Sequence, residues 1–324
     1  MSARPSRKTQ NAPDLEQPQS GGSITAGMAW NLAAPHTWPA AIIPVLIATC
    51  IAATRGSLSV GTTITLLLIA ILMQSSANTF NDYYDYVKGT DSTDDYVDPS
   101  DSVLVYNNVN PRSALVLAIG YLAAAFVLGI SIIVRAGVTP LVIALIGAVF
   151  VVLYSAGKTP VSYLPIGEIT SGFVMGGLIL VASYQALTIQ FDWLSFVWAI
   201  PTIIGVGLIM MTNNTSDIER DIAAGRKTLP VTLGRNRAVP FYRIAVLVWI
   251  AAIVIIVAIF FTPGCIVLPF MILAGYPLVN ALFNNPLTPE RRLQSMPQIL
   301  SVNIVLGAFY AASILASGFI TLAL

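Results

Sequence analysis

The first stretch of the chain that could do chemistry lies between Gln74 and Asp91. Its polar side chains recur at steps of three and four residues, which places them on one face of a helix. These side chains are Gln74, Asn78, Asn81, Asp82 and Asp85, followed by Lys88 and Asp91. Carboxylates this close together repel one another, so an ordinary solvated helix end explains them poorly.

A second stretch repeats the arrangement further along the chain. Asn214, Asp217 and Asp221 again share a helical face, and the basic side chains Arg220, Arg226 and Lys227 lie beside them. Carboxylates that face one another favour the binding of a hard cation, which prefers oxygen ligands. Mg²⁺ is such a cation, and it also binds phosphate oxygens. The basic side chains could bind the same phosphate oxygens. Together the two stretches predict a site for Mg²⁺ and a diphosphate.

The elements that must position these stretches are membrane helices. The chain has 324 residues, of which 56% are hydrophobic and only 10% are charged, whereas about 25% of the residues of a soluble domain are charged. Apolar runs of about 20 residues recur, and each could cross a bilayer core about 30 Å thick. The composition excludes a soluble, a disordered and a disulfide-rich protein. The net charge of +1 gives no reason to expect a nucleic-acid partner.

We therefore predict an all-α, polytopic membrane protein. A disordered cytoplasmic tail is expected in residues 1–27, with nine transmembrane helices in residues 28–324. The expected helices cover residues 38–54, 59–86, 112–134, 138–156, 166–189, 193–218, 239–262, 264–283 and 298–322.

The charges predict an orientation for this bundle. Fourteen of the 16 lysines and arginines fall on the side of the N-terminus, which the positive-inside rule assigns to the cytoplasm. Both acidic stretches end even-numbered helices at that face. The polar site is therefore expected at the cytoplasmic face of a cell (inner or plasma) membrane, with the C-terminus outside.

The two stretches also resemble the motifs of a known family. The UbiA superfamily of intramembrane prenyltransferases carries N-D-x-x-D and D-x-x-x-D motifs, which residues 81–85 and 217–221 match. Residues 81–91 and 213–231 are similar in more detail to the branch of 1,4-dihydroxy-2-naphthoate polyprenyltransferases. Weaker similarity occurs at residues 39–46 and 164–168.

This resemblance implies a reaction and a set of residues. The reaction is Mg²⁺-dependent transfer of a polyprenyl group from polyprenyl diphosphate to an aromatic acceptor, 1,4-dihydroxy-2-naphthoate in this branch, with loss of CO₂ to give demethylmenaquinone in menaquinone biosynthesis. The implied catalytic residues are Asn81, Asp82, Asp85, Asp217 and Asp221. The implied metal ligands are Asp82, Asp85, Asp91, Asp217 and Asp221. The implied substrate-binding residues are Asn78, Lys88, Tyr154, Lys158, Asn214, Arg220, Arg226 and Lys227.

Departures from the branch leave the acceptor open. Residues 34–36 and 107–108 stand where the branch usually has basic residues or Ser-Gly, and Ser216 stands where arginine is common. A UbiA-type enzyme with another aromatic or a phospho-sugar acceptor is the first alternative. A cation or phosphate transporter is the alternative from another class. Transporters usually hold their ionisable groups near the bilayer midplane, whereas both acidic stretches end their helices, which argues against transport.

Overall fold

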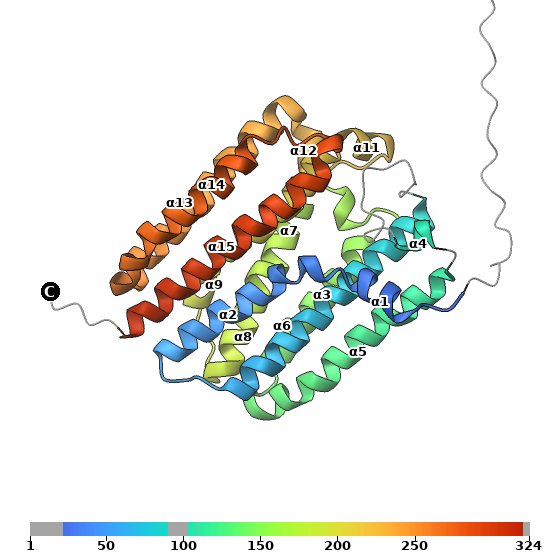
Figure 1. Cartoon of the computed structure of the whole chain (residues 1–324). Helices are drawn as coiled ribbons and strands as arrows, with labels where there is room; N and C mark the ends of the chain where they lie inside the picture. The colour runs from blue at the N-terminus through green and yellow to red at the C-terminus, as the bar shows by residue number, and fades with distance from the viewer. Residues whose placement is uncertain (1–21, 90–102, 108, 320–324) are drawn as a thin grey trace, which may run out of the picture.

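The protein is a bundle of long helices that lie side by side (Figure 1). The structure, a computed structural model, describes residues 22–89, 103–107 and 109–319. Most of the expected N-terminal tail and Asp91 fall outside these ranges. Within them, each of the nine expected ranges contains a helical stretch, and several of the stretches are broken into shorter elements. In chain order the stretches are α2 (Pro39–Thr54), α3 (Val60–Lys88), α5 (Pro111–Ala136), α6 (Thr139–Ser155), α7, η3 and α8 (Gly167–Ser171, Gly172–Leu178 and Ile179–Thr188), α9 and α10 (Leu194–Trp198 and Ile200–Ser216), α13 (Arg235–Phe260), η4 and α14 (Thr262–Val267 and Leu268–Phe283), and η5 and α15 (Pro289–Arg291 and Arg292–Phe319).

Short elements connect the long ones, mainly at one end of the bundle. They are α1 (Ala26–Ala33), η1 (Pro35–Thr37), α4 (Val103–Tyr106), η2 (Val161–Tyr163), α11 (Ile218–Ala223) and α12 (Leu229–Leu233). Two long helices begin earlier than their sequence predicts, α13 at Arg235 and α15 at Arg292. Pro240 and Pro297 therefore lie inside these helices and not in their first turns. A proline near a helix start removes few N–H···O bonds, which is why an extra turn can precede it.

Several of these helices can cross a membrane. By length and composition, six helical stretches qualify among the described residues, and a seventh is added if the bent pair formed by residues 26–37 and 39–54 counts as one span. The six are α3, α5, α7 to α8, α13, η4 to α14, and η5 to α15. Helix α6 is apolar but shorter. Many large apolar side chains on their outer faces are exposed, as in Val134, Leu273 and Phe319, which suits contact with lipid.

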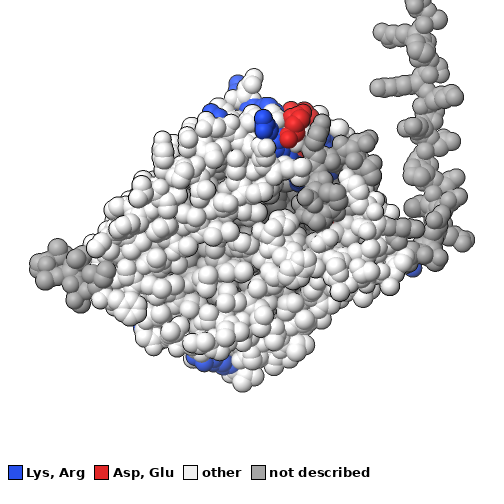
Figure 2. Space-filling view, viewed as in Figure 1, with Lys and Arg blue, Asp and Glu red and all other residues white. Residues whose placement is uncertain are grey.

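Charged side chains gather away from this apolar surface. In Figure 2 most of the coloured atoms lie at the upper end of the molecule, over α11 and α12, and the surface below them is almost entirely white. A small basic patch marks the opposite end. This separation matches the sequence prediction that polar chemistry belongs to one end of the helices.

Close backbone packing fixes the helix that carries the second acidic stretch. The π-helical segment η3 lies against α10, and a Cβ built on Gly176 would come within 2.3 Å of the Thr202 carbonyl oxygen. The hydroxyl of Thr202 donates to the Gly176 carbonyl at 2.7 Å. Only a residue without a side chain fits this contact, so the Gly-rich sequence of η3 sets how closely α10 approaches it.

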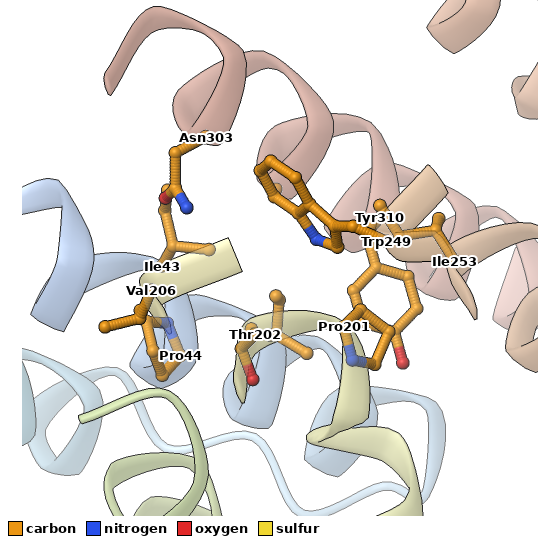
Figure 3. Close-up of a pocket in the computed structure, with 11 residues that line it drawn as sticks. Ile43, Pro44, Pro201, Thr202, Val206, Trp249, Ile253, Asn303 and Tyr310 are labelled. Carbon is orange, nitrogen blue, oxygen red and sulfur yellow. The ribbon is translucent and has the colours of Figure 1, made fainter. Parts of the chain in front are cut away.

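The core between α2, α10, α13 and α15 is packed around aromatic side chains (Figure 3). Trp249 and Tyr310 face Asn303 and Thr202 across a space of about 10 Å³, which has room for one water molecule at most. A Cβ on Gly205 would lie 2.5 Å from the Trp249 ring. The hydroxyl of Tyr310 donates to the Trp198 carbonyl at 2.9 Å. This part of the bundle is therefore a rigid support and not a ligand site.

Candidate active site

A polar cavity of about 290 Å³ lies where the two acidic stretches meet. It is lined by the ends of α1, α3, α6 and α10, by η1 and by the beginning of α15. The lining includes most of the residues that the sequence singled out. These are Asn78, Asn81, Asp82, Asp85, Tyr154, Asn214, Asp217, Arg220 and Arg226. Two motifs that are far apart in the chain thus face one cavity.

The first motif is held by amide hydrogen bonds on the last turns of α3. Asn81 donates to Asp85 Oδ2 at 3.1 Å and accepts a hydrogen bond from the Ser155 hydroxyl at 3.1 Å, so α6 fixes its orientation. Asn78 donates to the Ala33 carbonyl and to the Thr37 hydroxyl, both at 2.9 Å. Asn78 therefore anchors the bend between α1 and η1 in addition to lining the cavity.

The second motif is divided between two helices. The sequence predicts one helix through residue 218, but α10 ends at Ser216 and the short helix α11 begins at Ile218. Asp217 lies at the junction, and its N–H still bonds the Asn213 carbonyl at 3.1 Å, so the chain keeps a nearly helical course. Asn214 donates to the Glu168 carboxylate at 2.8 Å. That contact connects the motif to the side chain of Glu168, which is buried at the start of α7.

One guanidinium connects the two motifs. Arg226 Nη2 lies 2.7 Å from Asp85 Oδ1, and Nη1 lies 3.7 Å from Asp221 Oδ1. The guanidinium carbon Cζ of Arg226 also lies over the Tyr163 ring, 4.8 Å from the ring centroid. The Arg226 side chain is only 13% exposed. A single cation therefore already lies between carboxylates of α3 and α11.

A turn at Gly225 puts Arg226 in this position. Gly225 has φ +72°, the left-handed conformation that glycine adopts without strain. The N–H of Arg226 bonds back to the Asp221 carbonyl at 2.8 Å, and this bond closes the end of α11. Its neighbour Lys227 is exposed.

The charges in this cluster shift each other's ionisation. Burial raises the pKa of Asp221 to about 6, and the charge of Asp217 acts in the same direction, against the opposing effect of Arg226. The Thr228 hydroxyl donates to Asp221 at 3.1 Å. Burial alone would lower the pKa of Arg226, but the charges of Asp85 and Asp221 outweigh it and raise that pKa above its ordinary value. Arg226 therefore stays cationic beside both motifs.

Arg292 is a cavity residue that the sequence interpretation missed. It is the first residue of α15, it lines the cavity, and its Nε lies 3.1 Å from Asp217 Oδ2. Its Nη2 donates to Asn213 Oδ1 at 2.7 Å. In the sequence Arg292 looks like one more basic residue of a cytoplasmic loop, and only its position next to a long helix could have distinguished it.

Four of the predicted site residues do not line the cavity. Lys158 and Lys227 are exposed. Lys88 donates to the Ser155 carbonyl at 2.7 Å and so ties α3 to α6. Asp221 is buried behind Arg226. A fifth residue, Asp91, lies outside the described residues.

The donor set suits a hard divalent cation, although its carboxylates are paired with arginines in this arrangement. Asp82, Asp85 and Asp217 contribute oxygens to one cavity, and Asp221 lies next to them. In the described part of the chain no three acidic, histidine or cysteine side chains are close enough together to hold an ion as they stand. Arg226 and Arg292 lie against these carboxylates. Carboxylate oxygens from both motifs nonetheless surround one cationic group, the guanidinium of Arg226. A metal site likewise needs several oxygen ligands around one cation.

A second, apolar cavity of about 440 Å³ continues from the polar one. The two share lining residues at their junction, namely Gln74, Ala77, Val151, Val174 and Met175. From there the second cavity extends between α3, α5, α6 and α8, lined almost completely by apolar side chains. Val174 and Met175 belong to η3, so the π-helical segment places two side chains at the junction.

Comparison with known proteins identifies the family. The UbiA prenyltransferase family matches residues 41–305, which is most of the chain and includes both acidic motifs. The chain belongs to the UbiA prenyltransferase family. This UbiA protein is accordingly a prenyltransferase, which excludes the transporter alternative.

Relatives of this UbiA prenyltransferase carry more specific names. It is 31% identical over 242 residues to the 1,4-dihydroxy-2-naphthoate octaprenyltransferase of Bacillus subtilis, covering 74% of this chain and 76% of the relative. It is 28% identical over 283 residues to the enzyme of that name from Mycobacterium tuberculosis, covering 85% of this chain and 94% of the relative. A solved UbiA homolog from Archaeoglobus fulgidus, bound to GPP and Mg²⁺, has the same fold. Its TM-score is 0.66 at 17% identity, with 90% of this chain and all of that chain (100%) covered.

Proposed function

We propose that this prenyltransferase catalyses the Mg²⁺-dependent transfer of a polyprenyl group to 1,4-dihydroxy-2-naphthoate with loss of CO₂, giving demethylmenaquinone in its reduced form. The observation that carries the proposal is the joining of two cavities. One is lined by both acidic motifs and by arginines, and the other is apolar. A polyprenyl diphosphate has the same two parts, a polyanionic head and a hydrocarbon tail. The names of the relatives support the choice of acceptor.

The diphosphate would bind at the polar end. Asp82, Asp85, Asp217 and Asp221 would hold Mg²⁺, which neutralises the departing diphosphate. Arg226 lies between the motifs, where a guanidinium can donate two parallel hydrogen bonds to phosphate oxygens. Hydrogen bonds of 3.1 Å each keep two aspartates oriented, Asn81 donating to Asp85 and Thr228 donating to Asp221. The cluster would thus stabilise negative charge as it develops on the leaving group.

The polyprenyl tail would extend into the apolar cavity. Gln74 and Met175 at the junction mark where the head group ends and the tail begins. Burial of hydrocarbon there contributes about 25 cal/mol per Å² of apolar surface. Because several lining helices also present apolar side chains outward, the far end of a long tail would meet only hydrocarbon.

The acceptor reaction balances without a strong base. The allylic C–O bond breaks and its electron pair leaves with the diphosphate. The ring carbon that bears the carboxylate forms the new C–C bond, and loss of CO₂ returns an electron pair to the ring. Decarboxylation replaces removal of a ring proton, which suits a chain whose one histidine, His36, lies in η1 and belongs to neither motif.

The proposed topology places this chemistry at the cytoplasmic face. We infer nine membrane crossings, with α6 and the α9–α10 stretch added to the six spans that qualify by length and to the bent α1–α2 pair. The N-terminus would be cytoplasmic and the C-terminus outside, in the cell (inner or plasma) membrane. The support is the position of fourteen of the 16 basic residues on one side of such a bundle.

Carboxyl-labelled acceptor tests the function. Purified protein with farnesyl diphosphate, Mg²⁺ and 1,4-dihydroxy-2-naphthoate labelled with ¹³C in the carboxyl group should release labelled CO₂ one for one with diphosphate. The Asp85→Asn variant is the control for non-enzymatic loss of CO₂. A prenylated product that keeps the label would reject the decarboxylation. No product from the naphthoate, while another phenol or a phospho-sugar is prenylated, would reject the acceptor.

A further inference from the structure

Arg292 touches the second acidic motif from a helix that belongs to neither motif. Its Nε contacts Asp217 Oδ2 at 3.1 Å, and its Nη2 contacts Asn213 Oδ1 at 2.7 Å. The side chain is 13% exposed and lines the polar cavity. These contacts engage two of the five N–H groups of the guanidinium, so its donor capacity exceeds what Asp217 and Asn213 require.

Packing of α15 does not depend on this contact. One turn further along, the hydroxyls of Ser295 and Ser216 lie 3.1 Å apart, and both residues are fully buried. Beyond them Leu306 and Tyr310 of α15 are buried in the core between the helices. A guanidinium placed on a carboxylate at the cavity wall therefore adds little to the helix contact, and its position calls for a role in the cavity.

We propose that Arg292 is an exchangeable counter-ion of Asp217 that positions the diphosphate. Without metal, Arg292 is the nearer of two guanidiniums that neutralise Asp217, the other being that of Arg220 with its Nη1 3.7 Å from the same oxygen. When a divalent cation binds Asp217, the guanidinium loses its carboxylate partner and is repelled by the metal, so it turns to the diphosphate. The inference rests on the proposed function, because it requires that metal and diphosphate bind in this cavity.

This role has effects of opposite sign on two affinities. Removing the guanidinium eliminates a competitor for Asp217, so Mg²⁺ alone should bind more tightly. It also removes a charge-assisted hydrogen bond to the diphosphate, so a prenyl diphosphate should bind more weakly. A purely structural residue would weaken both affinities together, since a displaced α15 disturbs the whole cavity wall.

The experiment measures both affinities on the full-length protein in detergent. Isothermal titration calorimetry gives the Mg²⁺ affinity without diphosphate, and then the affinity for geranyl thiodiphosphate, an unreactive analogue, at saturating Mg²⁺. For Arg292→Gln we expect Mg²⁺ binding about threefold tighter or more and analogue binding about tenfold weaker or more. Arg291→Gln is the matched control, because Arg291 is exposed and contacts Gln294. It should change neither affinity.

Arg292→Lys keeps the result interpretable if the glutamine variant fails to fold. Lysine retains the charge but lacks the planar guanidinium that can donate two parallel hydrogen bonds. The Mg²⁺ affinity should therefore stay near that of the wild type, while analogue binding weakens. If the wild type binds no analogue with Mg²⁺, the proposed function itself fails. If the wild type binds but both affinities of Arg292→Gln fall, or neither changes, this inference alone is overturned. Loss of dihydroxynaphthoate binding with unchanged analogue binding would also overturn it, since Arg292 would then bind the acceptor.

Discussion

Replacing Arg226 by glutamine tests the connection between the two acidic motifs. Arg226 lies 2.7 Å from Asp85 and 3.7 Å from Asp221, and all three side chains are at most 13% exposed. Glutamine keeps the length of the aliphatic stem approximately but removes the charge. The variant therefore leaves two buried carboxylates without the cation that they share.

The expected loss of stability follows from these contacts. Removing one partner of a buried ion pair costs about 3–5 kcal/mol. The lower end applies here, because Asp85 keeps its bond from Asn81 and Asp221 keeps its bond from Thr228. A loss of about 3 kcal/mol corresponds to a fall in Tm of about 4 °C for a chain of this size. Mg²⁺ should restore more than half of it, since the metal binds the same carboxylates.

Activity should fall independently of stability. A charge-assisted hydrogen bond from Arg226 to the diphosphate contributes about 1.5–3 kcal/mol, which corresponds to a roughly 10- to 100-fold decrease in kcat/KM. Tryptophan fluorescence during heating, with and without Mg²⁺, gives the Tm, and prenyl transfer from farnesyl diphosphate gives the rate. The control is Arg237→Gln, because Arg237 is an exposed basic residue near the start of α13. Its Tm and its rate of prenyl transfer should equal those of the wild type.

Two results would refute this reasoning. If Arg226→Gln has the same Tm as the wild type in the absence of Mg²⁺, the two carboxylates do not need the guanidinium for stability. An equal gain in Tm from Mg²⁺ in both proteins would show that the metal binds elsewhere.

Three further predictions concern pH, tail binding and topology. Because the pKa of Asp221 is raised to about 6, protons should compete with Mg²⁺ for this carboxylate below pH 6. The Mg²⁺ affinity measured by calorimetry should then fall about tenfold for each pH unit, and Asp221→Asn should remove this pH dependence. Gly129 lines the apolar cavity, and a side chain at this position would extend into open space. Gly129→Trp should therefore raise the KM for long prenyl diphosphates more than the KM for geranyl diphosphate. An equal change in both KM values would exclude this cavity as the site of the tail. In a cysteine-free protein in intact cells, an impermeant thiol reagent should label a cysteine at Leu58 and spare one at Lys158; the reverse pattern would invert the proposed orientation.

Local sequence features predicted most of the helices and the two motifs. Hydrophobic runs and helical periodicity depend on residues within a few turns of one another, so they are readable without the fold. The starts of α13 and α15 lie earlier than the sequence predicts: Gly234 directly precedes α13, and the 3₁₀ turn η5, whose N-cap is Thr288, leads into α15. Asp82, Asp85 and Asp217, which the same local rules assign to helix ends, line one cavity.

The sequence by itself determined the all-helical membrane class, the polar end of the bundle and the aspartates that face the cavity. Only the tertiary structure decided which basic residues join them. Arg226 meets Asp85 across 141 residues and Arg292 meets Asp217 across 75, so no local pattern can reveal either contact. Arg226 and Lys227 are adjacent and chemically similar, yet the left-handed turn at Gly225 buries one against the carboxylates and leaves the other at the surface. The difference lies in backbone direction and long-range packing, which residue types and spacing do not contain.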